Sequence, residues 1–339
     1  MKTIRWSKGL IVTIDQTRLP EKLVYIKLRN PREIADAIKN MKIRGAPLIG
    51  AAAALALAQT AYHSKAKNAE DFINELKKTA NLIRSTRPTA VNLFNAIDYI
   101  LKLTEEFKGS VKELKKHILD ECFRLVNKDY EINRQLSLKG AELIEDGDCI
   151  LTHCNAGELA TVGYGTALGV IKAAFMQGKK INVIITETRP LLQGARLTAF
   201  ELKKAKIPFT LITDNMVGYV MWKGLIRKVI VGADRILLSG HVINKIGTYT
   251  IAVLAQKHSI PFYVAAPTST IDSKSKVEDV IIEERKPDEV LTFMGRRITP
   301  KNVKVLNPAF DITPPELVAG IITEKGVIRP LAEEIKNVI

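Results

Sequence analysis

Short apolar runs alternate with helical patterns from residue 148 onward, and this alternation constrains the fold more than any other feature of the sequence. The runs have the length of buried strands and lie at 149–152, 181–185, 209–212, 228–231 and 262–265. Helical patterns separate them, at 158–176, 193–206, 215–224 and 247–258. Strands that alternate with helices form a parallel sheet with helices on both faces. The sequence therefore predicts a Rossmann-like α/β domain.

The first part of the chain has a different pattern. Apolar and polar residues alternate over 4–28, with turn signals at Gly9 and Pro20, which predicts a small meander of strands. Asn30 and Pro31 then follow in the order of a helix cap and a first helical residue. Further helical patterns lie at 46–63, 70–86, 90–107 and 110–145. We therefore expect two domains, a mainly helical one with a strand cap at 1–125 and the Rossmann-like one at 126–339.

The composition argues against several classes of protein. The N-terminus lacks the apolar core of a signal peptide, and no stretch approaches the roughly 20 apolar residues of a membrane span. Three cysteines in 339 residues do not make a disulfide framework. We therefore expect a cytoplasmic protein without a membrane partner.

The net charge of +15 raises the question of an anionic partner. The lysines are spread along predicted helices, and the sequence has no basic arm or zinc finger. Functional nucleic-acid binding is therefore not expected. Dense surface charge is also typical of adaptation to heat, and composition does not separate these interpretations.

Polar and ionisable residues follow directly after each predicted strand of the second domain. The segments are His153–Gly157, Glu187–Pro190, Thr213–Asn215, Gly232–Arg235 and Pro267–Thr270. Ligands of open parallel sheets bind at the carboxyl ends of the strands, so these segments mark a candidate active site. Surface loops are also polar, and ordinary loops remain the alternative.

Two residues stand out among these segments. Cys154 lies between a strand and the predicted helix start at Glu158, where backbone N–H groups favour a thiolate; the alternative is a packing cysteine. Asp234 follows the strand at 228–231 and is expected to project over the sheet edge. Its alternative is a salt bridge with Arg235 or a helix cap. We expect His153 to point away from Cys154 and to have a structural role.

Two arginines of the first domain precede predicted helices. Arg44 and Gly45 come just before the helix at 46–63, and Arg87 comes before Pro88 at the next such start. A guanidinium at a helix N-terminus can bind a phosphate group with two hydrogen bonds, so both arginines could bind one phosphate. As isolated patterns both are weak, because such loops are common.

The sequence gives no sign of a metal or nucleotide site. The five histidines are scattered, and no Cys-x-x-Cys or His-x-x-x-His pair occurs. There is no P-loop, and Gly163–Gly165 lacks the later glycine of a dinucleotide motif. We therefore expect no cofactor, and the Rossmann-like pattern alone fixes no function.

Nine segments, spread over nearly the whole chain, make a more specific pattern. They are Ile43–Pro47, Arg87–Leu93, Thr152–Gly157, Glu187–Leu197, Asp214–Met216, Gly232–Ile236, Asn244–Tyr249, Ala266–Thr270 and Asn307–Asp311. In this order they resemble the methylthioribose-1-phosphate isomerase family, the aldose–ketose isomerases of methionine salvage. The superfamily also includes ribose-1,5-bisphosphate isomerases and the regulatory subunits of translation initiation factor 2B. His241 and Met216–Tyr219 depart mildly from the family pattern, which leaves the exact substrate slightly more open.

The resemblance implies a site and an activity. It implies that Asp234 is the proton donor and that Cys154 is the second catalytic group. The residues that it implies for substrate binding are Arg44, Gly45, Ala46, Arg87, Gln193, Asn244 and Lys245. It also implies a homodimer that converts 5-methylthioribose 1-phosphate to 5-methylthioribulose 1-phosphate without metal or nucleotide. The alternatives are a ribose-1,5-bisphosphate isomerase and a non-catalytic regulatory subunit, and the retained pair of Cys154 and Asp234 argues against the regulatory subunit.

The chemistry of such a substrate assigns a task to each of the two residues. A sugar with its phosphate on the anomeric carbon does not open by itself, so an acid must protonate the ring oxygen. Burial beside Val231 and Ile236 is expected to raise the pKa of Asp234 and suit it to this task. Hydrogen must then move from C2 to C1, as a proton taken by a Cys154 thiolate or as a hydride in a dry pocket. Both routes remain open.

Overall fold

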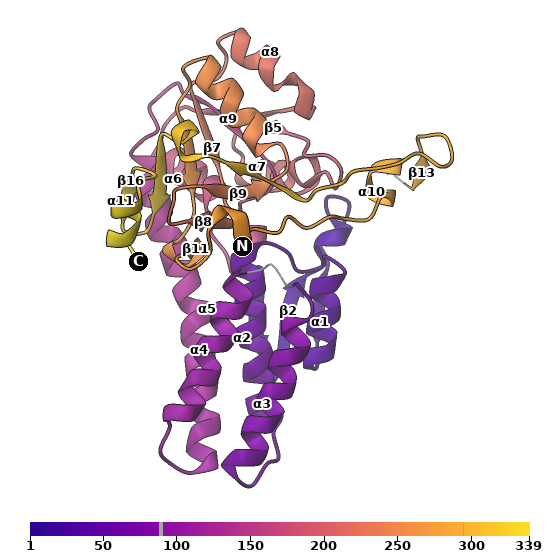
Figure 1. Cartoon of the computed structure of the whole chain (residues 1–339), viewed down its shortest axis with the longest axis vertical. Coiled ribbons are helices and arrows are strands. Elements are labelled where there is room, and N and C mark those ends of the chain that lie inside the picture. The colour runs from indigo at the N-terminus through magenta and orange to yellow at the C-terminus, as the bar shows by residue number, and fades with distance from the viewer. Residues whose placement is uncertain (88–90, 294) are drawn as a thin grey trace. The chain divides into compact units, whose positions relative to one another are not determined.

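The computed structural model describes residues 1–87, 91–293 and 295–339, and Figure 1 shows their helices and strands. These residues form two compact units. The first comprises Met1–Arg134 and Gly157–Gly165, and the second comprises Gln135–Ala156 and Thr166–Ile339. The long helix α5 (Val111–Ala141) has residues in both units.

The first unit combines a strand meander with helices, as the sequence predicts. Strands β1 (Ile4–Ser7), β2 (Leu10–Ile14) and β3 (Tyr25–Leu28) pair antiparallel in chain order. The helices are α1 (Pro31–Lys39), α2 (Ala46–His63), α3 (Ala69–Arg84), α4 (Val91–Glu106) and the first part of α5. Asn30 caps α1, since its side-chain oxygen accepts a hydrogen bond from the backbone N–H of Glu33 at 3.0 Å.

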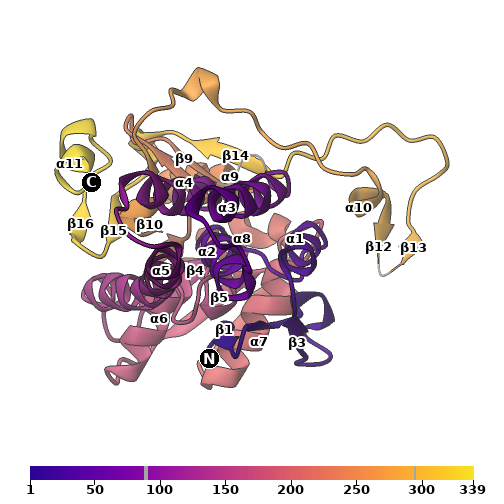
Figure 2. The ribbon, with the colours of Figure 1, turned by 90° about the horizontal axis from the view of Figure 1, so that it is seen from below.

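Helix α2 forms the centre of the first unit. It is apolar on all sides, as expected of a buried helix, and it packs against α1, α3 and α4 (Figure 2). Its many small side chains allow close packing, and a Cβ at Gly50 would lie only 3.0 Å from the carbonyl oxygen of Asn92 in α4.

The second unit contains a seven-stranded sheet. In spatial order its strands are β6 (Phe209–Ile212), β5 (Asn182–Thr186), β4 (Cys149–Thr152), β7 (Lys228–Val231), β10 (Phe262–Ala265), β15 (Gly320–Thr323) and β16 (Gly326–Ile328). All neighbours pair parallel except β15 and β16, which form an antiparallel edge. The five predicted strands are therefore present and occupy five adjacent positions.

Helices cover both faces of this sheet. Leu151 and Val229 face a cluster with α8 (Val217–Trp222), α9 (Thr248–Lys257) and α11 (Ala332–Asn337). Their neighbours Ile150 and Ile230 face the opposite cluster, with the end of α5, α6 (Ala167–Met176) and α7 (Ala199–Ala205). Consecutive strand residues point to opposite faces, so strands buried on both sides are apolar throughout.

A second, smaller sheet adjoins the carboxyl end of β7. Its order is β11 (Ile271–Asp272), β8 (Arg235–Leu237), β9 (Val242–Lys245) and β14 (Phe310–Thr313). The sequence does not predict these strands, which are short and partly polar. Further along the chain, α10 (Asp288–Leu291) precedes a hairpin of β12 (Thr292–Phe293) and β13 (Arg296–Arg297). No helix in the described part of the chain is long and apolar enough to cross a membrane.

The predicted helix over 158–176 is wrong in its first half. Only a short 3₁₀ turn forms at Glu158–Ala160, and α6 begins at Ala167. Tyr164 and Gly165 have φ values of 118° and 90°, which an α-helix does not accommodate. The predicted helix at 193–206 begins with a π turn, Gly194–Thr198, before α7, and the predicted helix at 110–145 ends at Ala141.

Candidate active site

The first unit places Gly45 where no other residue fits. Gly45 is the N-cap residue of α2 and has a φ of 93°. A Cβ there would lie 2.6 Å from the Cα and carbonyl oxygen of Ala160, in the 157–165 segment of the same unit. This tight turn presents the buried Arg44 on one side and the first helical residue, Ala46, on the other.

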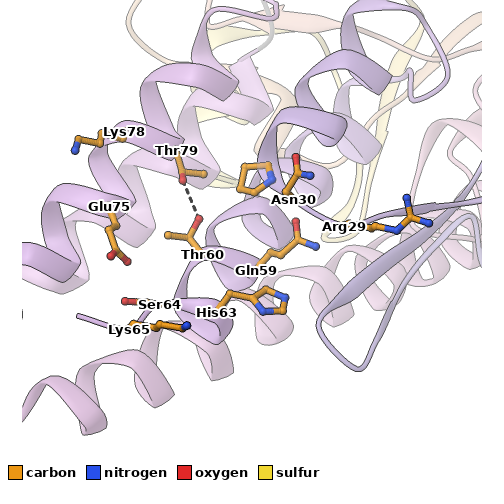
Figure 3. Close-up of a pocket in the computed structure, with 11 residues that line it drawn as sticks. Arg29, Asn30, Gln59, Thr60, His63, Ser64, Lys65, Glu75, Lys78 and Thr79 are labelled. Atoms are coloured by element: carbon orange, nitrogen blue, oxygen red, sulfur yellow. Dashed lines mark hydrogen bonds between the residues drawn. The ribbon is translucent and has the colours of Figure 1, made fainter. Parts of the chain in front are cut away.

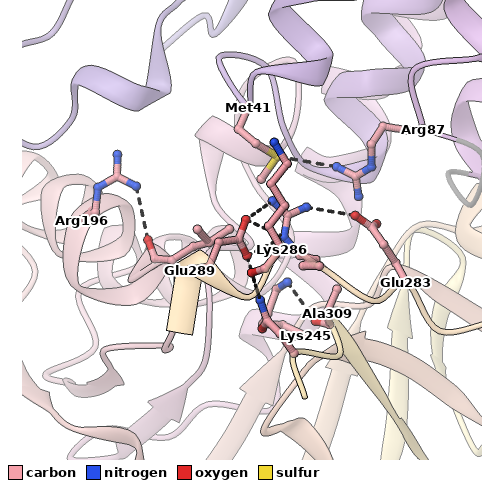
Figure 4. A network of polar contacts seen from close by, with 11 residues as sticks. Met41, Arg87, Arg196, Lys245, Glu283, Lys286, Glu289 and Ala309 are labelled. Atoms are coloured by element: carbon pink, nitrogen blue, oxygen red, sulfur yellow. Dashed lines mark hydrogen bonds and ion pairs between the residues drawn. The ribbon is translucent and has the colours of Figure 1, made fainter. Parts of the chain in front are cut away.

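Arg87 lies beside the same loop. Its Nη1 is 3.8 Å from Sδ of Met41, three residues before Arg44 (Figure 4). The structure therefore brings the four predicted binding residues of the first unit, Arg44, Gly45, Ala46 and Arg87, to one loop region. Pro88, the second residue of the predicted Arg–Pro motif, lies outside the described residues.

Cys154 has an unusual backbone in the second unit. It follows β4 with a φ of 62°, the left-handed conformation, which costs a residue other than glycine on the order of 1–3 kcal/mol. Its N–H donates to Thr188 Oγ1 at 2.9 Å, and its carbonyl accepts from Thr198 Oγ1 at 2.6 Å. Two threonine hydroxyls therefore hold its backbone, while the side chain stays half-buried.

The predicted helix start at Glu158, on which the expected thiolate at Cys154 was based, is wrong. Only a 3₁₀ turn lies there, and α6 begins at Ala167, where the N–H groups of Thr166 and Leu168 donate to the carbonyl oxygen of Ala156. The backbone of Cys154 is held by side-chain hydroxyls from other segments.

His153 is buried, as a structural role requires. Its Nδ1 is 2.6 Å from Thr186 Oγ1, and its Nε2 is 2.9 Å from the carbonyl oxygen of Ile246. Burial lowers the pKa of His153, so the ring is neutral near pH 7.

The loops that carry Cys154 and Asp234 meet. They follow β4 and β7, which are adjacent and parallel. A Cβ added to Gly232 would lie 2.8 Å from the Cβ of Ala156, so the backbones are in close contact. The structure therefore places the two predicted catalytic residues on neighbouring loops at the carboxyl ends of adjacent strands.

Asp234 stands at a junction between the two sheets. Its backbone N–H donates to the carbonyl oxygen of Ile243 at 3.0 Å, where the β8–β9 hairpin begins. Val231 and Ile236, on either side of it in sequence, are fully buried. The neighbouring Arg235 forms an ion pair with Asp272, with 3.4 Å between Nη1 and Oδ2.

Gln193 has a buried amide oxygen. The residue is 4% exposed, and its Oε1 has no hydrogen-bond partner among the described residues. A buried acceptor without a donor costs stability unless a ligand or water supplies one. This oxygen can accept a hydrogen bond from a substrate hydroxyl.

Asn244 and Lys245 end strand β9. The side chain of Asn244 is buried and donates to Thr248 Oγ1 at 3.0 Å. Nζ of Lys245 donates to the carbonyl oxygen of Ala309 at 2.9 Å and lies 4.7 Å from the centre of the Phe310 ring (Figure 4). Both are therefore held in defined orientations.

Several residues of the second unit to which sequence reasoning gave no role support these positions. Asp214 accepts from the backbone N–H groups of Thr188 at 2.8 Å and Arg189 at 2.7 Å. Asp311 accepts from the N–H of Gly247 at 2.7 Å, and burial raises its pKa to about 6. Thr188 and Asp214 lie both in the family-like segments and in the polar segments that follow predicted strands, whereas for Asp311 the family-like segment Asn307–Asp311 is the only signal in the sequence.

An ion-pair cluster orders the segment after residue 282. Arg285 lies 3.0 Å from a carboxylate oxygen of Glu283 and 2.6 Å from one of Glu289 (Figure 4). The pKa of Arg285 is raised, chiefly by its hydrogen bond to Glu289.

A separate cavity of about 570 Å³ lies in the first unit (Figure 3). Its lining includes Asn30, Thr60, His63 and Thr79, and among the described residues none of the predicted site residues contributes to it. Within the same described ranges, no three His, Cys, Asp or Glu side chains are grouped so as to hold a metal ion.

Comparisons with known proteins agree on one family. The model of the Initiation factor 2 subunit family matches residues 42–330. The methylthioribose-1-phosphate isomerase of Acetivibrio thermocellus is 52% identical over 338 residues, which are 98% of each chain. The crystal structure of 5-methylthioribose 1-phosphate isomerase from Pyrococcus horikoshii is 45% identical, with a TM-score of 0.93 over 99% of this chain and 95% of that one.

A further solved structure is named as a subunit of a translation initiation factor and not as an isomerase. The crystal structure of the translation initiation factor eIF-2B, subunit delta, from A. fulgidus is 52% identical, with a TM-score of 0.88 over 100% of this chain and 99% of that one. The chain therefore belongs to the Initiation factor 2 subunit family, and within it to the group of methylthioribose-1-phosphate isomerases.

Proposed function

We propose that the protein is the isomerase that converts 5-methylthioribose 1-phosphate to 5-methylthioribulose 1-phosphate in methionine salvage. One observation supports this above all: the loops of Cys154 and Asp234 touch at the carboxyl ends of adjacent strands. The near full-length identity to named isomerases gives the reaction class.

In this proposal Asp234 protonates the ring oxygen. The bond from C1 to that oxygen breaks, and the phosphate stays on C1. Hydrogen then moves from C2 to C1, and the C2 hydroxyl loses its proton as the ketone forms. Asp234 itself is half-buried and lies in sequence between the fully buried Val231 and Ile236, which supports partial exclusion of water from the acid. Cys154 is either the base that takes the C2 proton or a group that shapes and polarises a dry pocket for hydride transfer.

The remaining predicted residues bind and orient the sugar phosphate. Arg44 and Arg87 bind the phosphate group together with the backbone at Gly45 and Ala46, since the guanidinium group and free N–H groups of a helix start suit phosphate. In the second unit, the residues proposed to contact the sugar are Gln193, Asn244 and Lys245. The unpartnered Oε1 of Gln193 supports its role as an acceptor for a sugar hydroxyl.

The proposal also covers the domain organisation, the location and the oligomeric state of the protein. It treats 126–339 as a Rossmann-like catalytic domain and 1–125 as a helical domain. The parallel strands β15, β10, β7, β4, β5 and β6, with helices on both faces, support the first part. We also propose that the protein is a cytoplasmic homodimer that uses neither a metal nor a nucleotide.

Two alternatives define the experiment. The A. fulgidus structure named as an initiation factor favours a regulatory role, and a ribose-1,5-bisphosphate isomerase would share the same chemistry. We therefore assay the purified protein with 5-methylthioribose 1-phosphate and with ribose 1,5-bisphosphate, and compare kcat/KM. We expect a preference of at least about 100-fold for the methylthio sugar, because a methylthio group needs apolar surroundings, whereas a second phosphate needs further cationic groups that the proposal does not include.

Two variants complete the test. Cys154→Ser and Asp234→Asn should each abolish turnover while the circular dichroism spectrum stays unchanged. Near-normal rates in either variant would remove that residue from the mechanism, and no turnover of either sugar by the natural protein would favour the regulatory role. Deuterium from solvent at C1 of the product would indicate a proton route, and its absence would argue against an enediol intermediate that exchanges with solvent.

A further inference from the structure

Cys154 keeps its left-handed backbone through contacts with a row of buried threonines. Its N–H donates to Thr188 Oγ1 at 2.9 Å. That oxygen lies 3.3 Å from Thr186 Oγ1, and Thr186 Oγ1 lies 2.6 Å from Nδ1 of His153. Both threonines and His153 are almost completely buried, so water does not compete for these hydrogen bonds.

The carbonyl group of Ile246 decides which atom donates and which accepts in each of these hydrogen bonds. The carbonyl of Ile246 can only accept, so the Nε2 of His153, 2.9 Å away, carries the hydrogen. The buried ring is neutral, and its Nδ1 therefore accepts from the hydroxyl of Thr186. Thr186 Oγ1 is then left as an acceptor, and the hydroxyl of Thr188, which itself accepts from Cys154, lies 3.3 Å from that oxygen and 3.4 Å from the backbone carbonyl oxygen of Thr186. In either case the Thr188 hydroxyl accepts from Cys154 and donates to Thr186.

The far end of the chain reaches the turn after β9. Gly247 has a φ of 100°, and a Cβ there would lie 3.3 Å from the ring of His153. The N–H of Gly247 donates to Asp311 Oδ2, which anchors the turn. Asn244 and Lys245 come directly before this turn. The chain thus connects the loop of Cys154 to the loop that follows two proposed substrate-binding residues.

We propose that Thr188, Thr186 and His153 are positioning residues that set the conformation of Cys154 and couple it to the Ile246–Gly247 turn. This inference rests on the proposed function for the catalytic role of Cys154. A merely structural role, in which the hydroxyls only satisfy buried polar groups, predicts lost stability without a specific effect on the reaction.

Thr188→Val tests the first link, because it removes the hydroxyl and keeps the shape. Thr188→Ser keeps the hydroxyl and should restore the behaviour of the natural protein. Thr323→Val is the matched control in the same unit, since Thr323 is fully buried and its hydroxyl donates to the carbonyl of Gly326 at 2.9 Å. Thr186→Val removes the hydroxyl that joins Thr188 to His153. It replaces Thr188→Val as the test variant if Thr188→Val does not fold.

Steady-state kinetics and the alkylation rate of Cys154 distinguish a positioning role from a merely structural one. In steady-state kinetics with 5-methylthioribose 1-phosphate, we expect Thr188→Val to lower kcat at least tenfold and to change KM less than threefold. In alkylation with iodoacetamide, followed by mass spectrometry of the Cys154 peptide, we expect the rate to rise at least threefold because the loop is released. Thr188→Ser and Thr323→Val should stay within twofold of the natural protein in both.

The inference is overturned if Thr188→Val and Thr323→Val lose similar stability and both keep kcat and the alkylation rate of Cys154. It is also overturned if Thr188→Ser behaves like Thr188→Val. A natural protein without isomerase activity would refute the proposed function instead, and the alkylation rates would still decide whether the chain positions Cys154.

Discussion

Gly232→Ala is expected to separate the loop that carries Cys154 from the loop that carries Asp234. The added Cβ would lie 2.8 Å from the Cβ of Ala156, whereas carbon atoms in contact prefer about 3.5–4.0 Å. Neither methyl group can rotate away, so the loops must move apart by roughly 1 Å. The φ of Gly232 is not in the left-handed region, and alanine therefore adds no backbone strain.

The displacement determines the size of the effect. A shift of about 1 Å between reacting groups can lower the rate on the order of 100-fold, and overpacking a core costs about 1–3 kcal/mol. We therefore expect kcat to fall about 100-fold and the free energy of unfolding to fall by about 1–3 kcal/mol. Isomerase kinetics at saturating substrate and urea unfolding followed by circular dichroism measure these two effects.

Two further variants make the test specific. Ala156→Gly combined with Gly232→Ala removes the opposing methyl group and should recover most of the lost activity. Gly218→Ala, in α8, places its Cβ 3.8 Å from the side chain of Leu254, which is ordinary contact. It should leave kcat unchanged and stabilise the protein by up to about 1 kcal/mol.

The reasoning is refuted if Gly232→Ala keeps kcat within threefold of the natural protein. It also fails if the double variant is as slow as Gly232→Ala alone, since the steric contact would then not be the cause.

Three other predictions follow from the structure. Arg44→Lys should raise KM about tenfold with little change in kcat, because lysine cannot bind a phosphate group with a planar pair of donors; Michaelis kinetics at constant ionic strength check this. Gly45→Ala should lower the free energy of unfolding by at least about 2 kcal/mol, since Ala160 leaves no room and the φ is 93°; an unchanged urea midpoint would contradict it. Asp311 has a pKa raised by burial to about 6, so the folded state holds its proton more tightly and the carboxyl group lowers stability as the pH rises to about 6. Asp311→Asn should therefore gain on the order of 2–3 kcal/mol over the natural protein between pH 4 and pH 8, and urea unfolding across that range would disprove this by showing a constant difference.

The main elements of the fold could be predicted because they are local patterns. A strand buried on both faces, such as β7, is a continuous apolar run, and α1 begins with a cap and a proline. Strands β8 and β14 escaped prediction because they are short and carry polar residues such as Arg235 and Asp311. Their pairing is decided by partners far away in the sequence, which a local pattern does not encode.

The sequence predicts candidate site residues but not the contacts that hold them. The positions of Cys154 and Asp234 at strand ends follow from the topology of any parallel sheet. The helix start expected at Glu158 did not form, because Tyr164 and Gly165 adopt positive φ values and interrupt the helical pattern. Alanine and glycine in that stretch suit a helix or a tight loop, and only tertiary contacts decide between them.

Backbone strain in the loops after β4 and β5 shows why the contacts that hold these loops are needed. Cys154, Thr188 and Leu192 all have φ values near 60°, and each such residue costs on the order of 1–3 kcal/mol. A chain keeps such conformations only where specific hydrogen bonds hold them. Thr188 both holds Cys154 and is itself held by the carboxylate of Asp214. The strain and its restraints therefore form one unit, so a change at Thr188 or Asp214 should alter the conformation of Cys154.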